Sequence, residues 1–388
     1  MLRGTCNRTR SPLQGSILVA SSLEAGLYDA MVASRAVVCG AGGLTGHMQS
    51  ICRGRGIPVL RVDESDLAGV TGEVTLHLES QSIIVESDTA SRAASPEAGE
   101  PSLDDLGSAC AVIADLQDIA TINACGPDAK RVDSFFIREE FLCLAAGLRP
   151  LDSMGGSPAD ITAYGQAVAD RLCGFVEALL PEQRLVLRLL DLRSDHAARV
   201  TELAQVAVEP NPELGLHGAR WLLGSNAYRD ALHAVLGSLR KRLGDEAGRV
   251  HLSVPFVNDA EEFATLSRHL ELPADVPVSA FIETPAAVHA TAAICASGAS
   301  ELFVGTKDLV QFYLAADRGN HLVAGSYQTR HPAVIDGIRR VVQSARATGT
   351  PVRVFALGAD LGHYLEQLPP PDGYMMCTAE LQQVILRS

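Results

Sequence analysis

The sequence predicts an α/β protein in which a small α/β domain precedes a (β/α)8 barrel. From residue 108 onward, short apolar runs alternate with amphipathic helical segments, which is the pattern of repeated βα units. Before them, residues 86–107 are rich in Ser, Ala, Pro, Glu and Asp and show no apolar period, so they predict a linker. A doubly wound sheet is the alternative arrangement for the larger domain.

Length and composition limit the classes of protein to which the chain can belong. Its 388 residues suffice for two domains, and contents of 47% hydrophobic and 20% charged residues are typical of a soluble globular protein. The net charge of −14 argues against a nucleic-acid-binding surface and against binding to an anionic membrane. No apolar run approaches the ~18–20 residues that span a bilayer. The nine cysteines are scattered without a CxxC pair, as expected of a cytoplasmic protein.

The N-terminal domain is expected over residues 16–85, after a disordered tail at residues 1–15. The tail carries Arg3, Arg8 and Arg10 but no acidic residue, and it lacks the apolar stretch of a signal peptide. A helix is expected at residues 46–55, and strands are expected at residues 16–20, 35–39, 59–62, 73–78 and 81–85.

The barrel domain is expected over residues 108–388, with helices such as 158–180, 227–243 and 332–348. Its strand candidates are the apolar runs at residues 111–114, 134–137, 185–189, 250–254, 278–282, 301–304 and 352–356. Polar residues follow several of these strands, namely Arg138 with Glu140, Arg188 with Asp191, Glu283, and Lys307 with Asp308. In a barrel these strand ends meet at one face, which is the catalytic face.

These residue types indicate chemistry with a phosphorylated acid. Carboxylates such as Glu283 and Asp308 are hard oxygen ligands for Mg²⁺. Arg138, Arg188 and Arg318 can bind carboxylate and phosphate with planar pairs of N–H donors. In the smaller domain, His47 ends a Gly-rich turn before the predicted helix, where free N–H groups and the helix dipole favour a phosphate. A histidine held in this way can carry a phosphoryl group.

Seven segments, in order, resemble the motifs of the phosphoenolpyruvate-utilising enzymes, which include enzyme I of the sugar phosphotransferase system, pyruvate phosphate dikinase and phosphoenolpyruvate synthase. GGLTGH at residues 42–47 resembles the phosphohistidine loop GG-x-TSH, and IREEF at 137–141 resembles LRTEF, with Glu139 in the threonine place. LRLLD at 187–191 resembles RTLD, and NPELG at 211–215 resembles NPxLG. FIETPAA at 281–287, FVGTKDL at 303–309 and ADRGN at 316–320 resemble ETPAA, GTNDL and DRGN.

The resemblance implies a phosphotransferase that uses Mg²⁺ and a phosphohistidine intermediate. Glu283 and Asp308 would hold the metal, and Arg138, Arg188 and Arg318 would bind phosphoenolpyruvate at the barrel's C-terminal face. His47, on a swivelling domain, would attack the phosphorus and pass the phosphoryl group to an acceptor, either a carrier protein or a small molecule. The family also implies a homodimer.

The chain departs from the family pattern at several positions. The family's proton-donating cysteine has no counterpart in residues 354–360, so Cys377 is the candidate substitute, although it could simply pack. Lys307 replaces an asparagine, His217 stands near an expected arginine, and His196 stands near an expected lysine; all three are candidate substrate ligands.

The sequence shows neither the helical subdomain of enzyme I nor the ATP-grasp domain of the dikinases and synthases, so the acceptor is unidentified. Two alternatives remain open. One is a barrel enzyme that acts on a phosphoenolpyruvate analogue with altered enolate chemistry, and the other is a non-catalytic regulatory relative that binds phosphoenolpyruvate.

Overall fold

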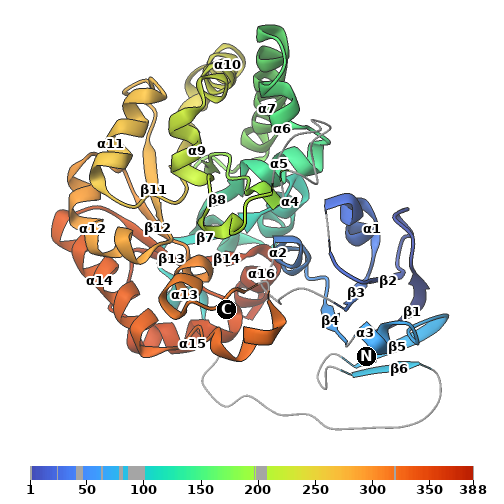
Figure 1. The fold of residues 1–388 in the computed structure, drawn as a ribbon. Coiled ribbons are helices and arrows are strands. Elements are labelled where there is room, and N and C mark those ends of the chain that lie inside the picture. The colour runs from blue at the N-terminus through green and yellow to red at the C-terminus, as the bar shows by residue number, and fades with distance from the viewer. Residues whose placement is uncertain are drawn as a thin grey trace. The chain divides into compact units, whose positions relative to one another are not determined.

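The computed structural model of the chain describes residues 2–23, 25–40, 47–62, 64–77, 82–85, 101–195, 197, 208–318 and 320–387 (Figure 1). The chain divides into two compact units. Unit 1 comprises Met1–Glu100 and Leu314–Tyr327, and unit 2 comprises Pro101–Tyr313 and Gln328–Ser388. The stretch 314–327, which the sequence places in the barrel domain, therefore groups with the N-terminal unit.

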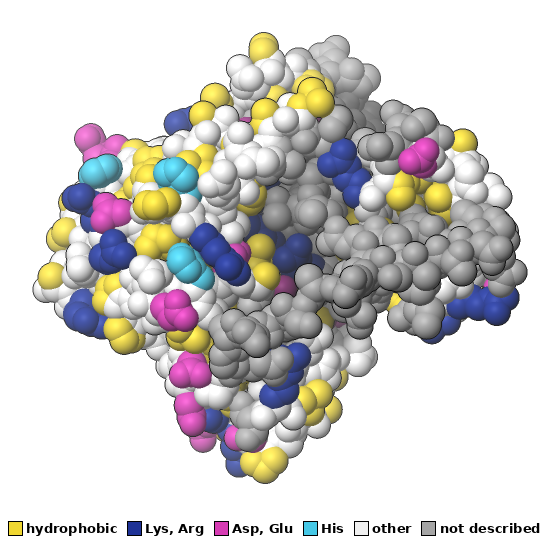
Figure 2. All heavy atoms as spheres, turned by 90° about the horizontal axis from the view of Figure 1, so that it is seen from below, with side chains coloured by type: hydrophobic (Ala, Val, Ile, Leu, Met, Phe, Trp, Pro, Cys, Tyr) yellow, Lys and Arg dark blue, Asp and Glu magenta, His cyan; other side chains and the backbone are white. Residues whose placement is uncertain are grey.

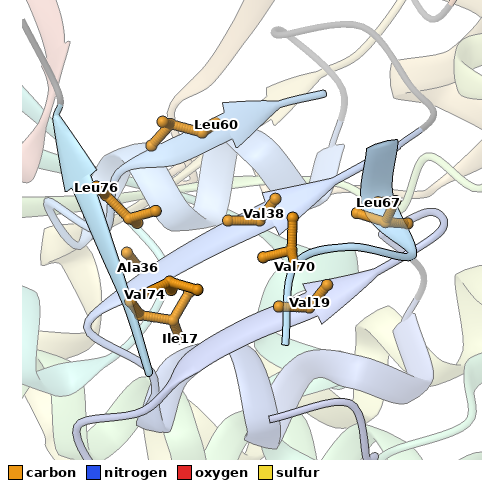
Figure 3. Packing of buried hydrophobic residues seen from close by; sticks show 9 residues of the cluster. All are labelled: Ile17, Val19, Ala36, Val38, Leu60, Leu67, Val70, Val74 and Leu76. Atoms are coloured by element: carbon orange, nitrogen blue, oxygen red, sulfur yellow. The ribbon is translucent and has the colours of Figure 1, made fainter. Parts of the chain in front are cut away.

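Unit 1 is built on a six-stranded sheet in the order β4-β3-β2-β1-β5-β6. Its strands are β1 (Leu2–Asn7), β2 (Ile17–Ala20), β3 (Ala36–Cys39), β4 (Val59–Arg61), β5 (Glu73–His77) and β6 (Ser82–Val85). Its helices are α1 (Tyr28–Ala33), α2 (His47–Gly54) and α3 (Glu64–Leu67). Figure 3 shows the apolar core on one side of this sheet, where Val19, Val38, Leu60 and Val70 are among the buried side chains.

Strand β1 lies where the sequence suggests a disordered tail. Residues 2–7 pair in parallel with β2 and antiparallel with β5, in the register Leu2↔Leu76. Arg3 Nε also lies 3.4 Å from Glu73 Oε2, and Thr5 Oγ1 donates to Glu73 Oε1 at 2.5 Å. The segment is short and polar, so its strand conformation comes from pairing with two apolar neighbours rather than from its own propensity.

Unit 2 is a closed barrel of eight parallel strands, and this confirms the predicted (β/α)8 fold over the doubly wound alternative. The strands are β7 (Ala109–Ile113), β8 (Val132–Arg138), β9 (Arg184–Arg188), β10 (Val250–Val254), β11 (Val278–Ile282), β12 (Leu302–Val304), β13 (Val352–Phe355) and β14 (Gly373–Cys377). The first seven match the predicted runs. For strand β14 the sequence indicates only a last strand end near Cys377, because GYMMC contains no β-branched residue, although all five residues are buried.

The barrel helices lie outside the strands in Figure 1. They are α4 (Leu116–Asn123), α5 (Glu139–Ala146), α6 (Pro150–Met154), α7 (Pro158–Ala178), α9 (Gly218–Gly224), α10 (Asn226–Leu243), α11 (Ala260–His269), α12 (Pro285–Ala296), α13 (Thr306–Leu314), α14 (Pro332–Thr348), α15 (Gly358–Gln367) and α16 (Thr378–Arg387). Helices α7 and α10 pack closely at Gly165, where an added Cβ would lie 2.5 Å from the carbonyl oxygen of Ala231.

The barrel unit begins before the end of the predicted linker. Residues Leu103–Leu106 form a 3-10 helix, capped by reciprocal bonds between Ser102 and Asp105, and Leu103 and Leu106 are fully buried. Gly107 follows with φ +60°, and a Cβ there would lie 2.6 Å from the carbonyl oxygen of Asp372. Burial of the two leucines explains why this part of the predicted linker is ordered.

The barrel interior is filled with aromatic and sulfur-containing side chains. A buried cluster contains Cys110, Phe136, Val186, Phe281, Phe303, Phe355, Met375 and Cys377. The Phe136 and Phe281 rings stack at 5.3 Å between centroids. Because side chains on a strand alternate between its two faces, the residues two positions before and after this cluster also face inward. These further inward-facing residues lie above and below the cluster, at the two ends of the barrel.

The N-terminal end of the barrel holds an ion-pair network around Arg353, two residues before Phe355. Arg353 donates to Asp133 at 2.6 and 2.7 Å and to Glu301 at 2.6 Å. Arg184 donates to the same Glu301 carboxylate at 2.9 and 3.0 Å. This end of such a barrel serves stability rather than catalysis.

The outer surface of the barrel mixes charges of both signs. On the face drawn in Figure 2, Lys and Arg side chains are interspersed with Asp, Glu and His side chains. Within the described residues, no helix is long and apolar enough to cross a membrane.

Candidate active site

The candidate site lies at the C-terminal end of the barrel strands. Arg138, Arg188, Glu283 and Gly305 each come two residues after an inward-facing cluster residue, namely Phe136, Val186, Phe281 and Phe303. The alternation of side chains therefore directs all four positions to the barrel mouth. Here "the mouth" denotes these four residues with Glu140, Asp191, His217, Lys307 and Asp308.

Arg188 is the centre of the mouth. Its Nη2 donates to Glu140 Oε1 at 2.6 Å and to Asp191 Oδ2 at 3.0 Å, and its Nη1 donates to Glu283 Oε1 at 3.1 Å. The guanidinium carbon lies 5.6 Å from the Phe281 ring centroid. Arg188 is only 1% exposed, so burial opposes its charge, but the three carboxylates outweigh burial and raise its pKa. The sequence predicts a substrate ligand here, whereas these donors engage protein carboxylates.

Glu283 and Asp308 are the predicted metal ligands. Both are buried, and Glu283 Oε2 also accepts the Phe256 N–H at 3.0 Å. Burial and the negative charges of Asp308 and Asp191 outweigh the Arg188 charge and together raise the pKa of Glu283 to about 8. A Cβ on Gly305 would lie 2.6 Å from Glu283 Cγ, so this carboxylate is packed against a position that only glycine fits.

The donor set fits Mg²⁺. This ion is commonly bound by one or two carboxylates together with substrate phosphate oxygens and water. Two buried carboxylates that repel each other gain from a divalent cation, because it would remove the repulsion that raises the pKa of Glu283. Among the described residues there is no cluster of three or more His, Cys, Asp or Glu side chains suited to a metal.

A small cavity at the mouth is lined by Arg138, Lys307, Asp308 and the aromatic rings of Phe281 and Phe355. Arg138 is buried, and within the described part of the chain its Nε has no hydrogen-bond partner. Burial and the nearby Arg188 charge lower its pKa. Lys307 Nζ lies 4.7 Å from the Phe355 ring centroid. The cavity thus combines two cations with a candidate metal ligand.

His217 lies beside the Arg188 carboxylates. Its Nδ1 is 2.8 Å from Asp191 Oδ1, and its Nε2 is 3.0 Å from the carbonyl oxygen of Glu213. Both partners are acceptors, so the protonated imidazolium satisfies both contacts. Burial alone would lower the pKa of His217, but the Asp191 charge and hydrogen bond outweigh it and raise the pKa.

The remaining predicted site residues, Cys377, Arg318, His196 and His47, are not among those that define the mouth. Cys377 ends β14 and is buried in the interior cluster with Phe355 and Met375. Arg318 falls in the stretch that groups with unit 1. His196 lies outside the described residues, as do residues 42–46 of the Gly-rich loop. His47 is the first residue of α2, and its side chain is likewise outside the description.

The structure also reveals a polar cluster that the sequence did not indicate as part of a site. Glu139 Oε1 accepts the Tyr164 hydroxyl at 2.7 Å, and Glu139 Oε2 accepts the Tyr228 hydroxyl at 2.5 Å. The one available signal was Glu139 itself, since it occupies a threonine place in the motif that it resembles. The two tyrosines lie far away in sequence and carried no signal.

Comparison with known proteins identifies the family. Residues 137–356 match the family described as "PEP-utilising enzyme, PEP-binding domain", and residues 12–89 match "PEP-utilising enzyme, mobile domain". The chain is 24% identical over 362 residues to the probable phosphoenolpyruvate synthase of Archaeoglobus fulgidus, covering 92% of this chain and 47% of that protein. It is 28% identical over 326 residues to the phosphoenolpyruvate-protein phosphotransferase of Streptomyces coelicolor, covering 79% of this chain and 54% of that protein.

A third relative is the multiphosphoryl transfer protein of Xanthomonas campestris pv. campestris, which is 27% identical over 335 residues. That match covers 79% of this chain and 36% of the relative. The chain thus spans about half, or less, of the length of these relatives. The two family matches follow the chain in the order expected from the motifs, and the longer one covers more than half of it. The chain belongs to the phosphoenolpyruvate-utilising enzyme family.

Proposed function

We propose that the protein is a Mg²⁺-dependent phosphotransferase that moves the phosphoryl group of phosphoenolpyruvate to His47 and then to an acceptor, either a protein or a small molecule. The observation that carries this proposal is the mouth cavity, where the buried Arg138 and Lys307 lie beside Asp308, whose charge in turn acts on the buried Glu283. Buried cations suit the phosphate and carboxylate of the substrate, and the carboxylate pair suits the metal.

Each group at the mouth has a distinct role in this proposal. Arg138 and Lys307 bind the anionic groups of the substrate, and His217 adds a fixed positive charge. The family resemblance adds Arg318, which belongs to unit 1, as a further substrate ligand. Arg188 holds Glu140, Asp191 and Glu283 in place through its three contacts. Bound Mg²⁺, held by Glu283 and Asp308, would neutralise charge on the phosphoryl oxygens.

The transfer forms a bond between an unprotonated imidazole nitrogen of His47 and the phosphorus. The bond between phosphorus and the enol oxygen breaks, and its electron pair stays on the pyruvate enolate. The cations of the mouth stabilise this developing charge. A proton then adds to the enolate carbon to give pyruvate, and Cys377 is the candidate donor of that proton.

One observation favours a second candidate function. Leu357, two residues after the end of strand β13, packs against the interior cluster. It lies in the stretch 354–360, where the family pattern leads us to expect the proton-donating cysteine. Without that thiol the enolate would persist or be quenched by another group. The barrel would then act on a phosphoenolpyruvate analogue with altered enolate chemistry, with His47 still as the relay.

The experiment is incubation with phosphoenolpyruvate and Mg²⁺, followed by intact mass measurement and a pyruvate assay. A gain of one phosphoryl group that is lost in mild acid supports a phosphohistidine. H47A and R138M should abolish this gain, whereas H289A, which removes an exposed histidine on α12, should retain it. Undiminished labelling of H47A would refute the proposal. Labelling with no pyruvate would favour the analogue, and binding without labelling would favour a regulatory relative.

The family resemblance also leads us to propose a homodimer in the cytoplasm. Sedimentation velocity tests the first part, because a sedimenting mass of one chain at all concentrations would contradict it. Fractionation of cells that express the protein tests the second part.

A further inference from the structure

Glu139 lies between two mouth residues but points to a different environment. It is the first residue of α5, between Arg138 and Glu140, and it is 2% exposed. Successive side chains on a helix point about 100° apart, so the neighbours of Glu139 can face the mouth while Glu139 does not. Its carboxylate instead accepts the hydroxyl groups of Tyr164 and Tyr228, at 2.7 and 2.5 Å.

The two tyrosines connect Glu139 to three other elements. Tyr164 belongs to α7 and Tyr228 to α10, the pair of helices that pack closely at Gly165. The Tyr228 oxygen also accepts the Leu190 N–H at 3.3 Å. Leu190 follows β9 and directly precedes Asp191, which binds Arg188. One carboxylate thus links the start of α5 to the end of β9.

The charge on Glu139 depends on pH near neutrality. Burial and the Glu140 charge outweigh the hydrogen bonds from Tyr228 and Tyr164, and the pKa of Glu139 is raised to about 7. The other titratable groups facing the carboxylate are Tyr164, Tyr228 and Cys143, and burial raises the pKa of each of them well above its ordinary value. Glu139 is therefore the group in this cluster that changes its charge near neutral pH.

We propose that Glu139 is a positioning residue for the mouth, in which the carboxylate ties the first turn of α5 to Leu190 and so fixes Arg138 relative to Asp191. The inference rests on the proposed function only in taking the mouth as the substrate site. The ionised carboxylate accepts from both tyrosines at once. A protonated carboxyl must donate one hydrogen bond, so one tyrosine has to turn from donor to acceptor, and Tyr228 already accepts the Leu190 N–H.

The single tryptophan of the chain is a built-in reporter of this network. The Trp221 ring lies 5.7 Å from the Tyr228 ring, at an interplanar angle of 66°. Emission from Trp221 should titrate with a midpoint near the Glu139 pKa of about 7. E139Q should abolish this transition, whereas E261Q, which alters an exposed glutamate on α11, should not. H217Q should also retain it, which separates Glu139 from the histidine at the start of α9.

A second variant keeps the test decisive if E139Q does not fold. Y228F retains the ring beside Trp221 but removes a hydroxyl that stabilises the ionised carboxylate, so the midpoint should move to higher pH. A transition that persists unchanged in E139Q, or a midpoint that Y228F leaves in place, overturns the proposal.

Ligand binding tests the link to the mouth. Calorimetry with phosphoenolpyruvate and Mg²⁺ gives the ratio of the dissociation constants of wild type and E139Q, in which the ionisation of the ligand itself cancels. This ratio should change by about fivefold or more as the pH crosses 7, which is the scale of a modest coupling between sites. A ratio independent of pH overturns the positioning role. If neither protein binds phosphoenolpyruvate, the proposed function fails, and the fluorescence titration still decides whether Glu139 controls the network.

Discussion

Replacing Arg188 with methionine should destabilise the barrel strongly at alkaline pH and weakly at acidic pH. Methionine approximates the length of arginine but cannot donate hydrogen bonds. R188M would therefore remove the guanidinium that lies within 2.6 to 3.1 Å of Glu140, Asp191 and Glu283, and would leave His217 as the ion-pair partner of Asp191. All three carboxylates are buried, so water cannot take over the role of Arg188.

The magnitude follows from burial. Removing one partner of a buried ion pair costs about 3–5 kcal/mol, because an uncompensated charge remains. Arg188 holds the raised folded-state pKa values of Glu283 and Glu140 below those that burial alone would give, so its contribution is greatest where these carboxylates are ionised and is lost as the pH falls through their folded-state pKa values, about 8 for Glu283. We therefore expect a loss of about 3–5 kcal/mol near pH 8 that shrinks toward pH 5, where a protonated carboxyl needs no counter-charge.

Urea unfolding followed by Trp221 fluorescence measures this loss, since the only tryptophan lies in α9 of the barrel unit. The matched control is R340M, which alters an exposed arginine on α14 and should change the free energy of unfolding by no more than about 0.5 kcal/mol. A loss of the same size at pH 5 and pH 8, or one below about 1 kcal/mol, would refute the assignment of Arg188 as the charge centre of the mouth.

Three further outcomes follow from individual contacts. G165A should lower the free energy of unfolding by about 1–3 kcal/mol in the same urea assay, since its Cβ would collide with α10; an unchanged value would contradict the close packing. The stability difference between wild type and H217Q should be greatest below pH 6.5 and shrink as the pH rises through the raised His217 pKa; a flat difference would contradict a protonated imidazole. R353M should lose about 3–5 kcal/mol yet keep its calorimetric affinity for phosphoenolpyruvate; a large loss of affinity would show that the network reaches the mouth.

Much of the barrel was predictable because its signals are local. Runs such as Val278–Ile282 are apolar and bounded by turns, and the polar residues that follow several of these runs identify the strand ends that reach the mouth. Glu283 and Arg188 were found in this way. Strand β1, where the sequence suggests a tail, and strand β14, of which only the end near Cys377 is expected, are stabilised by their neighbours, and their own residues are polar or unbranched.

The partners of the site residues were beyond prediction for a different reason. Arg188 contacts Glu140 and Glu283, which lie 48 and 95 residues away in the chain. Glu139 and Tyr228 are separated by 89 residues. Such pairs depend on strand order and helix packing. No local pattern in a single sequence shows which strands and helices will lie side by side. The residue types at the mouth were thus predictable, whereas the occupation of the Arg188 donors by carboxylates was not.

The aromatic interior separates the charged groups at the two ends of the barrel, so that substitutions at one end do not affect the other. The Arg353 network pairs two arginines with two carboxylates, whereas the carboxylates around Arg188 contact Arg188 and His217; the stacked rings of Phe136 and Phe281 lie between the two groups in strand order. Substitutions at the mouth can therefore alter charge and specificity without disturbing the network that holds the barrel closed. The free-energy losses of R188M and R353M should add to within about 0.5 kcal/mol in the double variant. A lineage can thus exchange residues at the mouth, as at Lys307 and His217, which depart from the family pattern, while inheriting the stabilising end of the barrel unchanged.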